Sequence, residues 1–75
     1  MVFHINIKSQ ADAQEINQIA TKYPFDIWLH GKSGQVDAKS ILGLMLLGLE
    51  NDISLVVEDD VDYKHLQKDI EKYLG

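Results

Sequence analysis

The chain reads Lys39-Ser40-Ile41-Leu42-Gly43-Leu44-Met45-Leu46-Leu47-Gly48-Leu49-Glu50 at its centre, and this run predicts a short helix. Ser40 suits the N-cap position because its hydroxyl can accept a hydrogen bond from an amide of the first turn. The nine residues that follow carry neither a charge nor a hydroxyl group. A helix without a polar side is not an ordinary surface helix, because it has no face suited to water.

A helical wheel divides the run into two sides. Leu44 and Leu47 fall together, between Gly43 and Gly48. The opposite arc consists of the other apolar residues, which are Ile41, Leu42, Met45, Leu46 and Leu49. One side is suited to the core, and the other side must meet a partner or lie partly exposed. The alternative is a short helix buried on all sides, since large exposed apolar patches are unusual on monomers.

In the rest of the chain, apolar residues recur either at every second position or at helical spacing. Alternating apolar and polar residues predict strands at residues 2–7, 25–30, 35–38 and 53–58. Helical spacing predicts a helix over residues 10–22, stopped by Pro24, and another over residues 62–74. The order is therefore β-α-β-β-α-β-α in a single domain, residues 1–75. A tight turn over residues 31–34 favours an antiparallel sheet that carries its helices on one face.

Composition excludes several classes of function. The 75 residues include no cysteine and carry a formal net charge of -5. That charge disfavours nucleic acid and membrane surfaces as partners, because both attract basic proteins. The longest apolar run is far too short to span a bilayer, and residues 1–5 do not resemble a signal peptide. We expect a soluble cytoplasmic protein without a cofactor, a metal ion or enzymatic activity.

The uncovered face of such a sheet has its own candidate site. Alternation places Val2, His4, Asn6, Trp28, His30, Ser54 and Val56 on this face. Trp28 with Val2 and Val56 forms an apolar patch, which is either a homodimer surface or an exposed patch without a partner. His4 and His30 also lie on this face, and both are expected to be solvated surface residues.

Three segments resemble the HPr family, the histidine-containing phosphocarriers of the bacterial sugar phosphotransferase system. They are Thr21-Lys22-Tyr23, the turn over residues 31–34, and above all residues 39–48, where the family pattern is Lys-Ser-Ile-Met-Gly-Val-Met-Ser-Leu-Gly. The resemblance implies an α+β open-faced β-sandwich, with a four-stranded antiparallel sheet and three helices on one face. In the strand order of that family the fourth strand separates the first two. His4 and His30 would then lie roughly 10 Å apart, too far to share a metal ion. The resemblance also implies core positions at Leu44 and Leu47, and a docking surface for protein partners at Ile41, Leu42, Met45 and Leu46.

The region that carries the family's chemistry departs from the pattern. Family members have Gly-Leu-His-Ala-Arg-Pro-Ala at the start of the first helix, and the histidine accepts the phosphoryl group. Here residues 8–13 contain no histidine, arginine or proline, and Ser9 is the nearest match to the acceptor. Serine is a poor nucleophile without an adjacent base, and Asp12 and Glu15 would repel a phosphate. We therefore expect an interaction or regulatory module without phosphocarrier activity. The alternative is an active phosphocarrier whose acceptor is another, unidentified residue.

Ser40 is a candidate site of regulation. It matches a serine that a dedicated kinase phosphorylates in the HPr proteins of some bacteria. A phosphate at this position would sit at a helix N-terminus, which favours negative charge, and Lys39 is adjacent. The alternative is that Ser40 only caps the helix.

Overall fold

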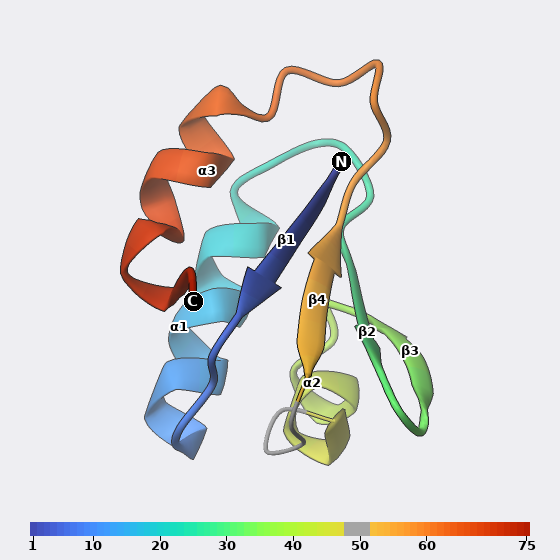
Figure 1. Ribbon diagram of the computed structural model, residues 1–75, viewed down its shortest axis with the longest axis vertical. Coiled ribbons are helices and arrows are strands. Elements are labelled where there is room, and N and C mark those ends of the chain that lie inside the picture. Colours follow the sequence, from blue (N-terminus) through green and yellow to red (C-terminus); the bar gives the residue numbers. More distant parts are fainter. Residues whose placement is uncertain (48–51) are drawn as a thin grey trace.

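Eight short elements follow one another along the chain (Figure 1). The computed structural model describes residues 1–47 and 52–75. The elements are β1 (Val2–Ile5), α1 (Gln10–Thr21), β2 (Trp28–Gly31), β3 (Gly34–Asp37), α2 (Ile41–Leu47), β4 (Ile53–Val56), α3 (Lys64–Asp69) and the 3-10 helix η1 (Glu71–Tyr73).

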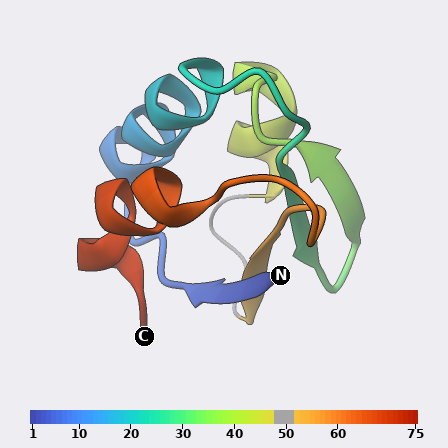
Figure 2. The same cartoon turned by 90° about the horizontal axis from the view of Figure 1, so that it is seen from above.

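The four strands form one antiparallel sheet in the order β1-β4-β2-β3. Figure 2 shows the helices gathered on one side of this sheet and the other side left open. The predicted open-faced architecture is confirmed. Because β4 lies between β1 and β2, the first two strands of the chain are not neighbours, as the resemblance implied.

The core lies between the sheet and the helices. Inward-facing residues of the strands, such as Phe3, Leu29 and Leu55, are buried, and their neighbours along each strand face outward. The helices contribute a buried stripe each, which includes Ile16 from α1 and Leu66 from α3. This alternation follows from the period of two in a strand that has one buried face.

The turn between β2 and β3 depends on glycine at one position. Gly34 has φ of +135°, a conformation that side chains with a Cβ rarely adopt. The paired residues Gly31 and Gly34 close the hairpin. The turn predicted over residues 31–34 is therefore confirmed.

Most predicted strand and helix ends differ from the structure by one to three residues, and two of the differences are notable. β2 begins at Trp28 rather than at residue 25, because Phe25 instead packs its ring against Tyr23, 5.4 Å between ring centres. The predicted last helix is interrupted at Ile70, so that α3 is followed by η1.

The residues after η1 lie beside β1. Leu74 is 37% exposed, and it forms a β-bridge with Ile5. The amide of Asn6 donates a hydrogen bond to the carbonyl of Tyr73 at 2.8 Å. The amide of Gly75 donates one to the carbonyl of His4 at 3.2 Å. The C-terminal residues thereby cover part of the outer edge of β1.

Candidate functional site

α2 presents one buried and one exposed side, as the helical wheel predicted. Leu44 and Leu47 are buried in the core. The exposed fractions are 41% for Ile41, 70% for Leu42 and 78% for Leu46, and Met45 is partly buried. Gly48 and Leu49, which the wheel also placed on these sides, lie outside the described residues. The alternative, a short helix buried on all sides, is wrong for residues 41–47.

α2 is held close to the sheet. A Cβ added to Gly43 would stand 3.2 Å from the Cβ of Val36, a residue of β3 that packs on the core. Glycine at this position therefore lets α2 approach β3 closely. The inner side of α2 is fixed against the core, while its outer side carries four apolar side chains and no charge.

Hydrogen bonds fix the start of α2. The hydroxyl of Ser40 accepts a hydrogen bond from the amide of Gly43 at 3.3 Å, as expected for an N-cap. The amide of Ser40 donates to the carbonyl of Asp37 at 2.9 Å. Lys39 turns away from Ser40, because its Nζ donates to the carbonyl of Tyr23 at 2.8 Å. The ammonium group of Lys39 is therefore bound to Tyr23, just after α1, and not to Ser40, in this arrangement.

The first turn of α1 holds a carboxylate. Ser9 is the N-cap of α1, and its hydroxyl accepts a hydrogen bond from the amide of Asp12 at 3.2 Å. The carboxylate of Asp12 in turn accepts from the amide of Lys8 at 3.0 Å. These two bonds resemble a capping box. They differ from the standard form in one bond, because Asp12 accepts from the amide of Lys8 and not from the amide of the N-cap Ser9. The N-terminal end of α1, which would attract an anion, therefore already carries the negative side chain of Asp12.

The three histidines lie away from this turn. His4 and His30 are exposed on strands whose outward residues face the open side of the sheet, opposite the helices. The Nδ1 of His4 lies 3.3 Å from the hydroxyl of Ser54. His65 lies on α3 beside a hollow that Tyr23 and Pro24 also line, at the other end of α1 from Ser9. No described contact joins a histidine to the first turn of α1.

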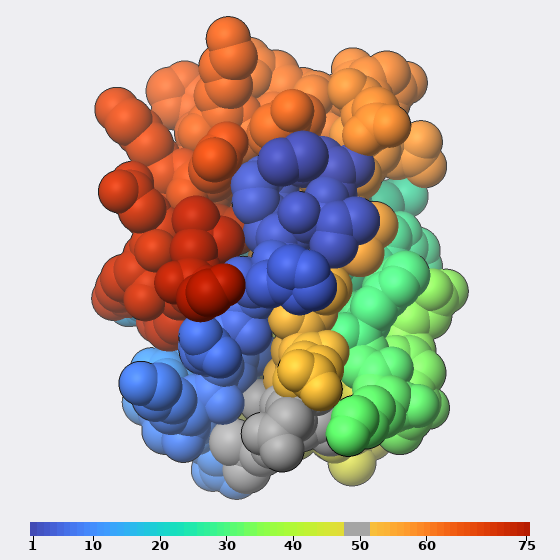
Figure 3. Space-filling view, in the orientation of Figure 1, coloured from blue at the N-terminus to red at the C-terminus, as the bar shows by residue number. Residues whose placement is uncertain are grey.

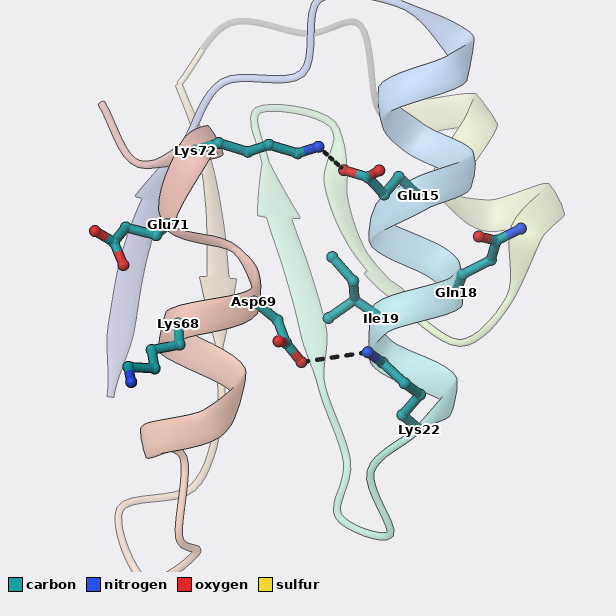
Figure 4. Close-up of a pocket in the computed structure, with 8 residues that line it drawn as sticks. All are labelled: Glu15, Gln18, Ile19, Lys22, Lys68, Asp69, Glu71 and Lys72. Carbon is teal, nitrogen blue, oxygen red and sulfur yellow. Dashed lines mark ion pairs between the residues drawn. The ribbon is translucent and has the colours of Figure 1, made fainter.

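A groove between α1 and the α3–η1 segment was not predicted (Figure 4). Eight residues line it: Glu15, Gln18, Ile19, Lys22, Lys68, Asp69, Glu71 and Lys72. Lys22 pairs with Asp69 at 3.4 Å, and Lys72 pairs with Glu15 at 2.5 Å. Three lysines and three acids balance each other, so the lining of the groove has no formal net charge. The sequence gives no signal for it, since its two walls are about fifty residues apart.

Residues 1–47 and 52–75 contain neither a metal-ion site nor a membrane-spanning helix. No three side chains of histidine, aspartate or glutamate come together there in a way that could hold a metal ion. None of the helices in those two segments is both long enough and apolar enough to cross a membrane.

Comparison with known proteins places the chain in a family. The model PTS-HPr, described as "PTS HPr component phosphorylation site", matches residues 9–74. A crystal structure of HPr-C-His from Thermoanaerobacter tengcongensis is 27% identical, with a TM-score of 0.71 over 96% of this chain and 85% of that chain. A crystal structure of the phosphocarrier protein HPr from Bacillus anthracis str. Ames is 20% identical, with a TM-score of 0.73 over 97% and 95%. No curated protein sequence matches significantly. Because the family model covers most of the chain and the fold agrees, the protein belongs to the HPr family of the phosphotransferase system.

Proposed function

We propose that this HPr-family protein binds other proteins through the outer side of α2 and does not itself carry a phosphoryl group on a histidine. The observation that carries the proposal is a contrast between the outer side of α2 and the N-terminal end of α1. Leu42 and Leu46 on α2 are largely exposed to solvent, whereas the N-cap of α1 is Ser9 and not a histidine. The chain keeps the apolar surface that family members use for docking, and it lacks the histidine that accepts the phosphoryl group at the start of α1.

The docking surface consists of Ile41, Leu42, Met45 and Leu46. Burying apolar surface releases about 25 cal/mol for each Å² removed from water, so these side chains favour association with a partner that covers them. Leu46 stands where the family pattern has serine, which makes this surface more apolar than the pattern. A partner that recognises it therefore gains more from burial and less from hydrogen bonding.

The first turn of α1 supports the second half of the proposal. The hydroxyl of Ser9 is used as a cap, and no described base lies beside it to remove its proton. The carboxylate of Asp12 is fixed on the amide of Lys8, at the position where a phosphoryl group would need positive charge. Both features disfavour phosphoryl transfer to this turn.

Ser40 is the site at which we propose regulation by a serine kinase. Its side chain is exposed, and it precedes Ile41 of the docking surface. A phosphate on Ser40 would place close to two negative charges beside that apolar surface, which would weaken association through it. Its hydroxyl is the cap of α2, so modification would also change how the helix begins.

The proposal is tested with phosphoenolpyruvate and the general phosphotransferase enzyme, using a working HPr as the positive control. We expect no acid-labile phosphoryl adduct on this chain under conditions that fully label the control. An acid-labile adduct on any histidine would establish the alternative, an active phosphocarrier with an acceptor elsewhere.

The docking half is tested by calorimetric titration with the same enzyme and with the family's serine kinase. We expect at least one of them to bind the wild-type chain, and Leu42→Lys and Leu46→Lys to abolish that binding. Gln67→Lys on α3 is the matched control, because it adds the same charge to an exposed helix position outside the docking surface. Absence of binding to both proteins, or binding that survives both leucine variants, would contradict the proposal.

A further inference from the structure

Lys39 joins the start of α2 to the end of α1. Its side chain is partly buried, and its Nζ donates a hydrogen bond of 2.8 Å to the carbonyl of Tyr23, the residue after the C-cap of α1. The last turn of α1 has no basic residue of its own, and the ammonium group of the C-cap Lys22 pairs with Asp69 instead. A positive charge near the carbonyl end of a helix is stabilising. Lys39 therefore supplies this charge to α1 from the segment that begins α2.

The segment that contains Lys39 is also held by a contact that does not involve its side chain. Nδ2 of Asn17 on α1 donates to the carbonyl of Ala38 at 3.1 Å, and the amide of Ala38 donates to the carbonyl of Ile27 at 2.9 Å. These bonds fix the backbone just before Ser40. The ammonium group of Lys39 can therefore exchange one partner for another while the segment stays in place against α1.

The charges around Ser40 favour such an exchange when Ser40 carries a phosphate. The carboxylate of Asp37 accepts from the amide of Lys39 at 2.9 Å, and the carbonyl of Asp37 accepts from the amide of Ser40 at 2.9 Å, so a negative side chain already lies nearby. A phosphoserine adds a charge of about -1.5 to -2, whereas the end of a helix is equivalent to about -0.5. Lys39 is the only basic residue between residues 33 and 63 of the sequence. Its ammonium group is thus the cation nearest along the chain for a phosphate at this position.

We propose that Lys39 transmits the effect of a phosphoryl group on Ser40 to the end of α1. The ammonium group leaves the carbonyl of Tyr23 and pairs with the phosphate, and the last turn of α1 loses its cation. The hydroxyl of Tyr23 donates to Asp69 on α3, so the change reaches the corner at which α1 meets α3. This inference rests on the regulation at Ser40 proposed above, and it adds a second place where that regulation acts.

The path from Ser40 to Tyr23 runs along the helix side of the molecule. Figure 3 looks onto the other side, where β1 in blue, β4 in gold and β2 in green reach the surface. The expected apolar patch lies there, because Val2 pairs with Val56 and Val56 pairs with Trp28. α1 and α2 pack on the opposite side of the sheet (Figure 2), so the exchange at Lys39 leaves this patch unchanged.

Amide hydrogen exchange tests the proposal on the whole chain, synthesised chemically with and without a phosphate on Ser40. The amides of Lys22 and Tyr23 donate to the carbonyls of Ile19 and Ala20, so their exchange reports on the last turn of α1. We expect these two amides to exchange about two- to fivefold faster in the phosphorylated chain. Lys39→Met should show the faster exchange without a phosphate, and a phosphate on Lys39→Met should add no further change.

Phosphorus NMR gives a second measurement. The second pKa of a phosphoserine is ordinarily about 6, and it should be lower in the wild-type chain than in Lys39→Met, because a nearby ammonium group favours the dianion. Lys8→Met is the matched control. It removes the same charge from an exposed residue before the other end of α1, and it should change neither measurement.

Each other outcome overturns the proposal. Equal exchange of the Lys22 and Tyr23 amides with and without the phosphate, or an equal phosphate pKa in the wild type and Lys39→Met, would show that Lys39 stays on Tyr23. An equal acceleration by the phosphate in Lys39→Met would show that the effect reaches α1 by another route. Because the phosphate is introduced by synthesis, these failures differ from the failure of a kinase to modify Ser40, which would count against the proposed function alone.

Discussion

The hydroxyl of Tyr23 donates a hydrogen bond of 2.5 Å to the carboxylate of Asp69, which ties the C-terminal end of α1 to α3. Lys22, the residue before Tyr23, pairs with the same carboxylate. The arrangement is repeated in the opposite direction, since Lys72 and the hydroxyl of Tyr73 both donate to Glu15 on α1. Each segment thus offers a lysine–tyrosine pair to a carboxylate of the other. These two reciprocal contacts hold α3 and η1 against α1.

Removing one tyrosine hydroxyl should measure the strength of such a contact. Tyr23→Phe deletes the donor and keeps the ring that packs on Phe25, so we expect a loss of about 1 kcal/mol in the free energy of unfolding. Urea unfolding of Tyr23→Phe, Asp69→Asn and the double variant measures the coupling between the two groups. Tyr63→Phe is the control, because no contact of its hydroxyl is described while its ring packs on Phe3. Additive effects of the two changes would contradict the contact.

The same pair predicts a loss of stability at high pH. Burial and the hydrogen bond to Asp69 raise the pKa of Tyr23 to about 12, above its ordinary value of 10. A pKa that is raised by folding means that the contribution is complete below about pH 10 and is lost as the pH rises toward 12. Urea midpoints across this range should therefore fall more steeply for the wild type than for Tyr23→Phe. Parallel curves for the two proteins would contradict the raised pKa.

The two carboxylates predict a loss of stability at low pH. Hydrogen bonds from Lys72 and Tyr73 hold the pKa of Glu15 below its ordinary 4.5, and the hydrogen bond from Tyr23 lowers the pKa of Asp69 below 3.8. Because folding lowers both values, the contribution is complete above the ordinary pKa and is lost as the pH falls through the lowered one. Unfolding monitored by circular dichroism from about pH 7 to about pH 2 should show this decline. The decline should be shallower in the double variant Glu15→Gln, Asp69→Asn, and an unchanged profile would count against the assignment.

Neighbouring leucines of α2 should respond very differently to truncation. Leu47 is 3% exposed and belongs to the core, so Leu47→Ala should cost about 2–5 kcal/mol in the free energy of unfolding. Leu46 is 78% exposed, and Leu46→Ala should change that free energy by less than about 0.5 kcal/mol. Urea unfolding of both variants makes the comparison on adjacent residues of one helix. Equal losses would show that both sides of α2 are packed in solution.

An imidazole placed at the N-cap of α1 should restore an acceptor if the rest of the scaffold still functions. We expect phosphoenolpyruvate-dependent labelling of the double variant Ser9→His, Asp12→Ala by the general phosphotransferase enzyme, and weaker labelling of Ser9→His alone. The reason is that the carboxylate of Asp12, bonded to the amide of Lys8, repels a phosphoryl group at this turn. Acid lability of the label and its absence from the wild type complete the measurement. Equal labelling of the single and double variants would show that Asp12 does not hinder transfer.

Local pattern predicted most of this fold, and it failed where distant segments meet. The four strands, the start of α1 at its serine cap and the two sides of α2 each have a signature within a few consecutive residues. The break at Ile70 and the bridge between Leu74 and Ile5 have none, because they depend on where the end of the chain meets β1. The reciprocal contacts between α1 and α3 were missed for the same reason. Lys22-Tyr23 and Lys72-Tyr73 carry no signal of these contacts in the sequence, because each pair meets a carboxylate on a segment far along the chain.

The bridge between Leu74 and Ile5 bears on how this protein resists polymerisation. An unpaired strand edge is a template for another chain, and growth along such edges leads to fibrils. Because residues 73–75 occupy hydrogen-bonding groups of His4 in β1 and of Asn6 just after it, that border of the sheet is partly closed to an incoming strand. The opposite border, β3, is the more open one, and fibril growth would be expected to begin there.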